Sequence, residues 1–273
     1  VKEKELHKII SYCKRNKINY LDTATAYKNY NLLSKLNIGK FKIITKLKNL
    51  SKIKKNNIEE ETMNYIESLL ESLKIKQIYG LLLHDVKPLY SKNAEIIIRS
   101  LELLKNKKLV KKIGISCYNL KDLNLVKKYK FDIVQFPLNI FDQRLLNKKT
   151  FSLLNKKKIE VHARSIFLQG LLLKDFKKLP NYFDKWKNEI LKYENFSKKA
   201  QKSKFELCVN FIKQQKLIDM MIVGVESQNQ IDQIRKQLNK KNFNFNYNIF
   251  SQSDDKLLLP YLWKINQKTN NNN

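Results

Sequence analysis

Four residues whose side chains can transfer or stabilise a proton stand where strand-like apolar runs end. Asp22 ends the run that begins at Ile18, and Tyr27 follows it by five positions. Lys46 stands near the end of a second run, and His84 ends a third. A buried strand must pair or neutralise every charge that it carries. Because the carboxyl ends of parallel strands share one edge of a sheet, we expect these four side chains to meet there and handle a proton.

Each of the four residues also has a purely structural interpretation. Asp22, placed before a threonine, has the pattern of a helix N-cap, and Tyr27 that of a packing or surface residue. Lys46 has the pattern of a lysine that buries its stem and keeps its ammonium in water. His84 has the pattern of a hydrogen-bonded structural imidazole. The occurrence of all four types in order, each at a strand end, favours the catalytic interpretation.

Apolar runs of strand length alternate along the chain with lysine-rich segments of helical period. The runs lie at residues 18–24, 41–47, 78–84, 112–118, 132–138, 160–167 and 220–225. Helices are expected at about 3–16, 57–74, 92–107, 120–129, 144–157, 197–215 and 227–238. This alternation predicts an α/β fold with a parallel sheet covered by helices. The runs predict seven strands, and an eight-stranded barrel needs one more before them.

The length of 273 residues suits a single barrel-sized domain over 1–273. The segment at about 171–195 has no strand counterpart and is predicted to be a loop insertion at the barrel rim. That loop either shapes a substrate pocket or only pads the rim. Residues at about 254–267 are predicted to form a C-terminal helix, and the Asn-rich end has nothing apolar to pack.

The formal net charge of +30 raises the question of a nucleic-acid partner, since clustered basic residues bind phosphates by releasing counterions. Lysines are spread over almost every expected helix instead of being focused on one face. This distribution argues against a specific nucleic-acid site. The same positive field would help to capture a phosphorylated cofactor.

Cysteine, histidine and hydropathy patterns exclude several other classes. The three cysteines have no C-x-x-C spacing, and the three histidines have no helical pairing, so neither a metal site nor a disulfide framework is expected. A reducing cytoplasm fits this cysteine usage. No apolar run reaches the length of a membrane span, and the charged first residues are no secretory signal.

The order of these motifs resembles the aldo/keto reductases over nearly the whole chain. The family's Asp-Thr-Ala-x-x-Tyr pattern is matched at 22–27, its Thr-Lys strand end at 45–46 and its apolar strand ending in His at 78–84. Four later segments resemble further family strands, at 112–118, 134–139, 161–171 and 221–225. Residues 164–173 are most similar to a bacterial subgroup often associated with surface-sugar biosynthesis.

The resemblance implies a (β/α)8 TIM barrel whose first strand is missing from this chain, and the reduction of an aldehyde or ketone, with sugar-derived carbonyls as candidates. Tyr27 would be the general acid. A free tyrosine has a pKa near 10, and a neighbouring cation lowers it, which is the role implied for Lys46. Asp22 would hold the ammonium, and His84 would orient the substrate carbonyl.

The resemblance also implies NADPH as the cofactor, with NADH as the alternative. Ser116 and Gln135 would hydrogen-bond the nicotinamide carboxamide, and Arg164 would stack where many members have tyrosine. The remaining expected cofactor contacts are Ser165, Leu168 and Gly170 along the pyrophosphate and Gly224 near the adenosine phosphate. Cys117 replaces the usual asparagine. Gln230 stands where some members grip the 2′-phosphate with arginine, so the choice between NADP and NAD stays open.

Three functions remain open from the sequence. The leading interpretation is a cytoplasmic, metal-independent reductase that acts on a small carbonyl compound, with no membrane partner and an undetermined oligomeric state. A non-catalytic nicotinamide-binding or interaction protein, that is, a decayed reductase, is favoured by the missing strand and by the altered residues 28–31 after the tyrosine. A basic nucleic-acid binder is the third interpretation and predicts steeply salt-dependent retention of DNA or RNA.

Overall fold

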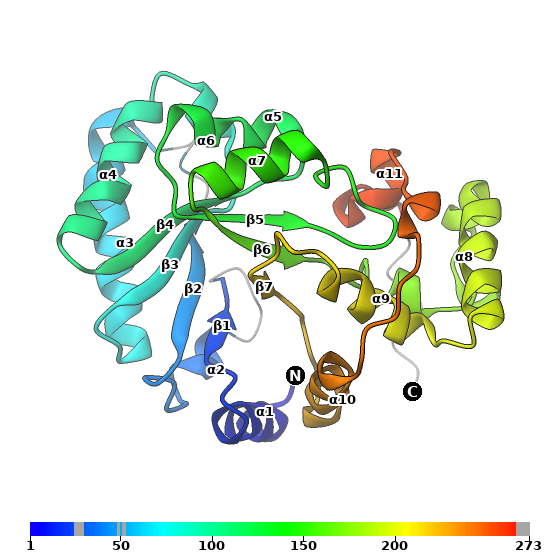
Figure 1. Ribbon diagram of the computed structural model, residues 1–273. Coiled ribbons are helices and arrows are strands. Elements are labelled where there is room, and N and C mark those ends of the chain that lie inside the picture. The colour runs from blue at the N-terminus through cyan, green and yellow to red at the C-terminus, as the bar shows by residue number, and fades with distance from the viewer. Residues whose placement is uncertain (25–29, 48–49, 51–52, 266–273) are drawn as a thin grey trace. The chain divides into compact units, whose positions relative to one another are not determined.

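The computed structural model of the protein describes residues 1–24, 30–47, 50 and 53–265. Seven strands form one sheet in which strand order follows chain order (Figure 1). They are β1 (Tyr20–Asp22), β2 (Lys42–Leu47), β3 (Ile78–Leu83), β4 (Val110–Ser116), β5 (Ile133–Pro137), β6 (Glu160–Arg164) and β7 (Met220–Met221). From β1 to β5 each strand pairs in parallel with the next. The predicted parallel α/β architecture is confirmed.

Helices separate the strands along the chain, as the sequence predicts. They are α1 (Glu3–Arg15), α2 (Tyr30–Leu33), α3 (Ile58–Leu73), α4 (Ala94–Asn106), α5 (Leu120–Leu123), α6 (Leu125–Lys128), α7 (Lys148–Lys156), α8 (Lys187–Lys199), α9 (Lys204–Lys213), α10 (Gln228–Asn239) and α11 (Asp255–Leu258). The helix α3 buries Ile58, Ile66, Leu69 and Leu73, which share one face at helical spacing. Three glutamates in its first turn interact favourably with the helix dipole.

The chain divides into two compact units. The first contains Val1–Phe136, Ser152–His162 and Gly224–Gln233, and the second contains Pro137–Phe151, Ala163–Val223 and Ile234–Asn273. In the first unit, α3 and α4 lie side by side and α4 packs against β4 (Figure 1). Strands β2 to β5 carry nearly continuous apolar runs, and Ile44, Leu82, Ile115 and Val134 are completely buried. Such runs are typical of parallel strands covered on both faces.

The segment predicted as a rim loop contains a helix. It begins with short 3-10 turns at Leu171–Leu173, Phe176–Lys178 and Asn181–Trp186, and α8 starts at Lys187. Ile190, Tyr193 and Ser197 follow helical spacing and are buried, so this face of α8 is held by packing. Whether the segment lies at a barrel rim and whether 1–273 is one domain stay predictions.

Three predicted helices are shorter or broken in the structure. The helix expected at 197–215 is interrupted at 200–203, between the end of α8 and the start of α9. The helix expected at about 254–267 is a single turn, α11, followed by a 3-10 turn at Pro260–Leu262. Pro260 has no N–H to donate and so ends the helical pattern. The helix expected at 120–129 is divided at Asn124 into α5 and α6.

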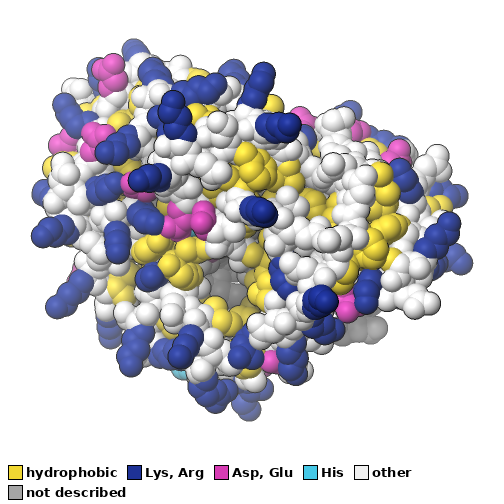
Figure 2. Space-filling view, viewed as in Figure 1, with side chains coloured by type: hydrophobic (Ala, Val, Ile, Leu, Met, Phe, Trp, Pro, Cys, Tyr) yellow, Lys and Arg dark blue, Asp and Glu magenta, His cyan; other side chains and the backbone are white. Residues whose placement is uncertain are grey.

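The structure also shows how the basic residues, the cysteines and the apolar helix segments are distributed. Figure 2 shows lysine and arginine side chains spread over the visible face rather than gathered in one patch. All three cysteines are buried, and none of them is in a disulfide bond. In the described part of the chain, no helix is both long and apolar enough to cross a membrane.

Candidate active site

Five predicted site residues stand at or near the carboxyl ends of strands β1 to β5, all in the first unit. Asp22 ends β1, Lys46 is the last but one residue of β2, and His84 directly follows β3. Ser116 ends β4 and pairs in register with Gln135 of β5. Since these strands are parallel, the five positions share one edge of the sheet, the edge where α/β folds place their functional groups.

A buried ion pair joins the first two of these residues. Lys46 Nζ lies 2.6 Å from Asp22 Oδ1, and the side chains are only 4% and 8% exposed. Gln135 Nε2 donates to the other carboxylate oxygen, Asp22 Oδ2, at 2.8 Å. The carboxylate therefore accepts two hydrogen bonds, one of them from a cation, which compensates for its removal from water. The structure brings Asp22, Lys46 and Gln135 together, and their catalytic roles stay predictions.

Of the other two predicted catalytic residues, the structure describes His84 but not Tyr27. Tyr27 lies outside the described residues. His84 is an exposed residue directly after β3, in line with Lys46 and Leu47 of the neighbouring strand, which pair with Leu82 and Leu83. The backbone thus places His84 at the same sheet edge as the ion pair.

Two buried oxygen atoms at this edge accept or donate no hydrogen bond within the described part of the chain. They are Ser116 Oγ and Gln135 Oε1. Their residues are 2% and 0% exposed and are register partners. A buried polar atom without a partner costs free energy, and such atoms are common where a ligand supplies the missing hydrogen bond. Cys117, which follows Ser116, is also fully buried.

The predicted pyrophosphate residues form a tight loop after β6, in the second unit. Ser165, Leu168, Gln169 and Gly170 all have left-handed backbone conformations, with φ of 59°, 46°, 52° and 83°. The value at Gly170 explains the glycine, since side chains disfavour this region. Arg164 Nη1 donates to Ser165 Oγ at 3.4 Å.

Gly224, the remaining predicted cofactor contact, lies in the first unit beyond β7. It is exposed, and a Cβ atom at this position would meet no atom within 4 Å. Space around it is therefore available for a ligand, although nothing in its backbone conformation requires glycine.

Asn139 is a positioning residue that the sequence interpretation did not single out. It is completely buried, and its side-chain oxygen accepts from the backbone N–H groups of Phe141 and Asp142 at 3.0 and 2.9 Å. Its Nδ2 donates to the backbone oxygen of Ser165 at 3.1 Å. Asn139 thus ties the turn after β5 to the loop after β6. An asparagine directly after an apolar strand is a turn signal, but its distant partner has no sequence signature.

A second polar cluster in the first unit was also missed. Glu160 begins β6, and its carboxylate accepts from His162 Nε2 at 2.7 Å, from Tyr79 Oη at 2.8 Å and from Lys112 Nζ. Burial opposes the charged form of Glu160, but hydrogen bonds from His162, Lys112 and Tyr79 outweigh it and lower the pKa to about 2. For Tyr79, burial is the largest cause of the shift and raises the pKa to about 12.

This cluster predicts an acid-sensitive contribution to stability. The folded pKa of Glu160 is below its unfolded value, so the stabilisation is present above about pH 4.5 and is lost as pH falls toward 2. Glu160→Gln should therefore lower the free energy of unfolding at pH 7 and leave it nearly unchanged at pH 2. Urea unfolding at several pH values measures the difference. A difference that is independent of pH would contradict the assigned pKa.

These observations define an α/β protein with parallel strands, an ion pair at their carboxyl edge and orphaned polar atoms beside it. The profile described as "Aldo/keto reductase family" matches residues 1–254, and the chain belongs to this family. The matched range includes every predicted site residue, so the family assignment covers the whole candidate site.

Several solved structures have a similar fold. The apo form of the aldo-keto reductase AKR11C1 from Bacillus halodurans is 18% identical, with a TM-score of 0.72 over 92% of this chain and 86% of that one. Its holo form is 19% identical, with a TM-score of 0.70 over 89% and 84%. The glycerol dehydrogenase AKR11B4 from Gluconobacter oxydans is 18% identical, with a TM-score of 0.66 over 87% and 80%. None of the curated proteins compared with this chain matches it. At these identities the likeness confirms the predicted barrel-type fold.

Proposed function

We propose that the protein reduces the carbonyl group of a small aldehyde or ketone with NADPH, or alternatively NADH, as hydride donor. The observation that carries the proposal is the buried Asp22–Lys46 ion pair at the carboxyl edge of the sheet. A buried ion pair does not by itself require a catalytic role. Three facts support that role. The chain belongs to the aldo/keto reductase family, the pair lies in line with His84, and Asp22 precedes Tyr27 by five positions.

The orphaned oxygen atoms fit a nicotinamide cofactor. Ser116 Oγ can donate to the carboxamide oxygen, and Gln135 Oε1 can accept from the carboxamide NH2 group. Gln135 Nε2 can keep its bond to Asp22 while its oxygen takes this contact. When bound, the reduced cofactor supplies a hydride to the carbonyl carbon. The loop containing Ser165, Leu168 and Gly170, together with Arg164 and Gly224, is proposed for the rest of the cofactor.

The residues of the chain would supply the proton. Tyr27 would donate it to the carbonyl oxygen, Lys46 would stabilise the phenolate that remains, and Asp22 would fix the ammonium. His84 would orient the carbonyl through a ring N–H group. We place the reaction in the cytoplasm, where free thiols such as those of the buried cysteines persist.

The choice of cofactor depends on an unusual residue. Gln230 Oε1 accepts from the backbone N–H of Glu226 at 2.7 Å, so this side chain closes the turn before α10. An uncharged glutamine gives a 2′-phosphate less electrostatic stabilisation than arginine. Both NADPH and NADH therefore belong in the first titration.

The direct test is titration of the purified protein with each nucleotide, in which quenching of tryptophan fluorescence reports binding. A panel of aldehydes, ketones and keto-sugars is then added, and loss of the reduced nicotinamide absorbance is measured. Saturable binding with turnover is the expected result. Binding without turnover on any carbonyl would favour the decayed-reductase alternative, and no binding by folded protein would refute the cofactor assignment.

A serine substitution separates cofactor binding from folding. Ser116→Ala removes a hydroxyl that has no partner in the described structure, so stability should stay constant or rise slightly. Loss of the carboxamide contact should weaken nucleotide binding roughly 3- to 10-fold. The matched control is Ser100→Ala on α4, whose buried hydroxyl donates to the backbone oxygen of Ile96 at 2.7 Å. That variant should lose about 1 kcal/mol of stability and keep its nucleotide affinity.

A further inference from the structure

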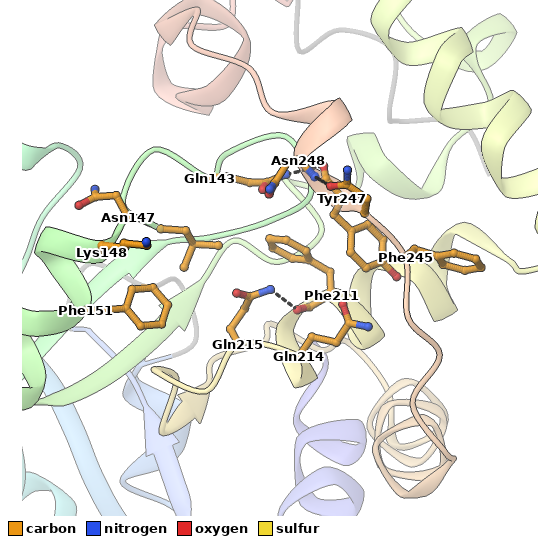
Figure 3. A pocket seen from close by; sticks show the side chains of 12 residues that line it. Gln143, Asn147, Lys148, Phe151, Phe211, Gln214, Gln215, Phe245, Tyr247 and Asn248 are labelled. Carbon is orange, nitrogen blue, oxygen red and sulfur yellow. Dashed lines mark hydrogen bonds between the residues drawn. The ribbon is translucent and has the colours of Figure 1, made fainter.

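A pocket of about 490 Å³ lies in the second unit, between the start of α7, the end of α9 and the segment 245–248 (Figure 3). Among the predicted catalytic and cofactor residues that the structure describes, none lines this pocket. Its volume falls within the range of roughly 300–1,000 Å³ that is usual for small-molecule sites. The pocket is therefore large enough for a ligand that the proposed reduction does not account for.

Aromatic rings form the apolar part of the pocket wall. Phe211 and Tyr247 are buried, with ring centroids 5.3 Å apart in an edge-to-face arrangement. Phe151 is a half-buried part of the lining, whereas the ring of Phe245 points away from Phe151 and packs against Phe196 and Phe243, with ring centroids 5.0 and 5.2 Å apart (Figure 3). Tyr247 Oη accepts from Asn210 Nδ2 at 3.1 Å, and burial raises the pKa of Tyr247 to about 12. The aromatic wall is therefore uncharged near neutral pH.

Three glutamines present hydrogen-bond acceptors to the pocket. Gln143 Nε2 donates to two backbone oxygens, at 2.7 and 2.8 Å. Gln214 Nε2 donates to the backbone oxygen of Phe243 at 2.5 Å and to a neighbouring asparagine oxygen at 3.3 Å. Gln215, just beyond α9, donates through Nε2 to the backbone oxygen of Phe211 in that helix at 2.9 Å. Gln143 and Gln214 thus use both N–H groups within the protein and offer their amide oxygens to a ligand, whereas Gln215 offers its amide oxygen and one N–H.

The pocket also retains donors of its own. The side-chain oxygen of Asn147 accepts from the backbone N–H of Thr150 at 3.0 Å, which fixes the amide and leaves its NH2 group for a ligand. Among the described residues that line the pocket, Lys148 is the only lysine or arginine, and none is an aspartate or glutamate. With a formal net charge of +30 on the chain, a cationic ligand is electrostatically disfavoured.

We propose that this pocket binds a neutral saccharide of one or two rings. A sugar hydroxyl both donates and accepts hydrogen bonds, which matches amide oxygens and amide NH2 groups in one wall. An apolar C–H face of a sugar ring would lie against Phe151. This site is independent of the proposed carbonyl reduction and does not require the bound sugar to react.

The test uses sugars that offer no carbonyl for reduction, namely methyl α-glucopyranoside, sucrose and trehalose. Binding to the full chain is measured by isothermal titration calorimetry and by saturation-transfer NMR, with glucose 6-phosphate and tetramethylammonium as charged comparisons. Gln215→Met removes an amide from the pocket at similar size, and Phe151→Ala removes a ring. Gln233→Met, on an exposed position of α10, is the matched control.

The expected result is saturable binding of at least one neutral sugar, weakened roughly 3- to 10-fold by Gln215→Met or Phe151→Ala and unchanged by Gln233→Met. Thermal unfolding confirms that each variant is folded. No saturable binding by the folded wild-type protein would overturn the proposal. Binding that the two pocket variants do not change would place the sugar elsewhere, and preference for either charged probe would refute a neutral ligand.

Discussion

Lys46→Met should reduce turnover of a carbonyl substrate by roughly two to four orders of magnitude, because it removes the cation that stabilises the phenolate of the proposed general acid. The same substitution leaves the buried carboxylate of Asp22 with the hydrogen bond from Gln135 Nε2 but without its cation. Removing one member of a buried ion pair typically costs about 3–5 kcal/mol. We expect a loss near the lower end, since the glutamine bond persists. Steady-state kinetics and urea unfolding measure the two effects.

Two further variants keep the two effects of Lys46→Met apart. Lys42→Met changes a lysine four positions earlier, at the start of β2, which is exposed and donates to Tyr20 Oη at 3.0 Å, and it should change stability by less than about 1 kcal/mol. Tyr27→Phe should abolish turnover and leave nucleotide affinity intact. Normal turnover in Lys46→Met would refute the role of the cation. A loss of stability as small as that of Lys42→Met would show that the pair is not buried in solution.

Gly114→Ala should destabilise the fold by about 3 kcal/mol or more, through overpacking against a neighbouring strand. A Cβ atom on Gly114 would press into the backbone carbonyl group of Ile133 and would lie 2.8 Å from Leu82 Cδ2. Gly114 and Ile133 are register partners of β4 and β5, so relief requires the two strands to separate. The measurement is the midpoint of thermal unfolding, or soluble yield if the variant does not fold.

Gly80→Ala is the matched control for Gly114→Ala. There the nearest atom to an added Cβ is Ile133 Cδ1 at 2.8 Å, the end of a flexible side chain. Rotation of that side chain can relieve the contact, and we expect a loss of about 1 kcal/mol. Equal losses in the two variants would show that the backbone contact at Gly114 relaxes as easily as a side chain.

The sequence predicts the strands well because each is a short apolar run. Ile43 and Ile44, for example, are completely buried on β2 as expected. It also predicts that Asp22 and Lys46 stand at adjacent strand ends, because this depends only on the strands being parallel. The hydrogen bond from Gln135 to Asp22 was not predictable, since it requires a side-chain rotamer and the register of strands far apart in the chain.

Other errors have similar physical causes. Glu160 was overlooked because its partners come from three different strand segments and share no spacing pattern. The helix α8 was assigned to a loop because turn-forming residues such as Pro180 precede it, although its own apolar positions have helical spacing. Local patterns therefore identify elements and candidate residues, whereas the partners of buried polar groups depend on tertiary packing.

The strand order of the sheet has a consequence for how the chain folds during synthesis. Each strand pairs with the strand that precedes it in the chain, as Gly80 does with Ile44 and Ile133 with Gly114. Partners are a few tens of residues apart, so each new strand meets an edge that has already been translated. Loop closure stays short at every step, and the sheet can grow in the direction of translation. The site edge at β1 to β5 would thus form before the ribosome has completed the second unit.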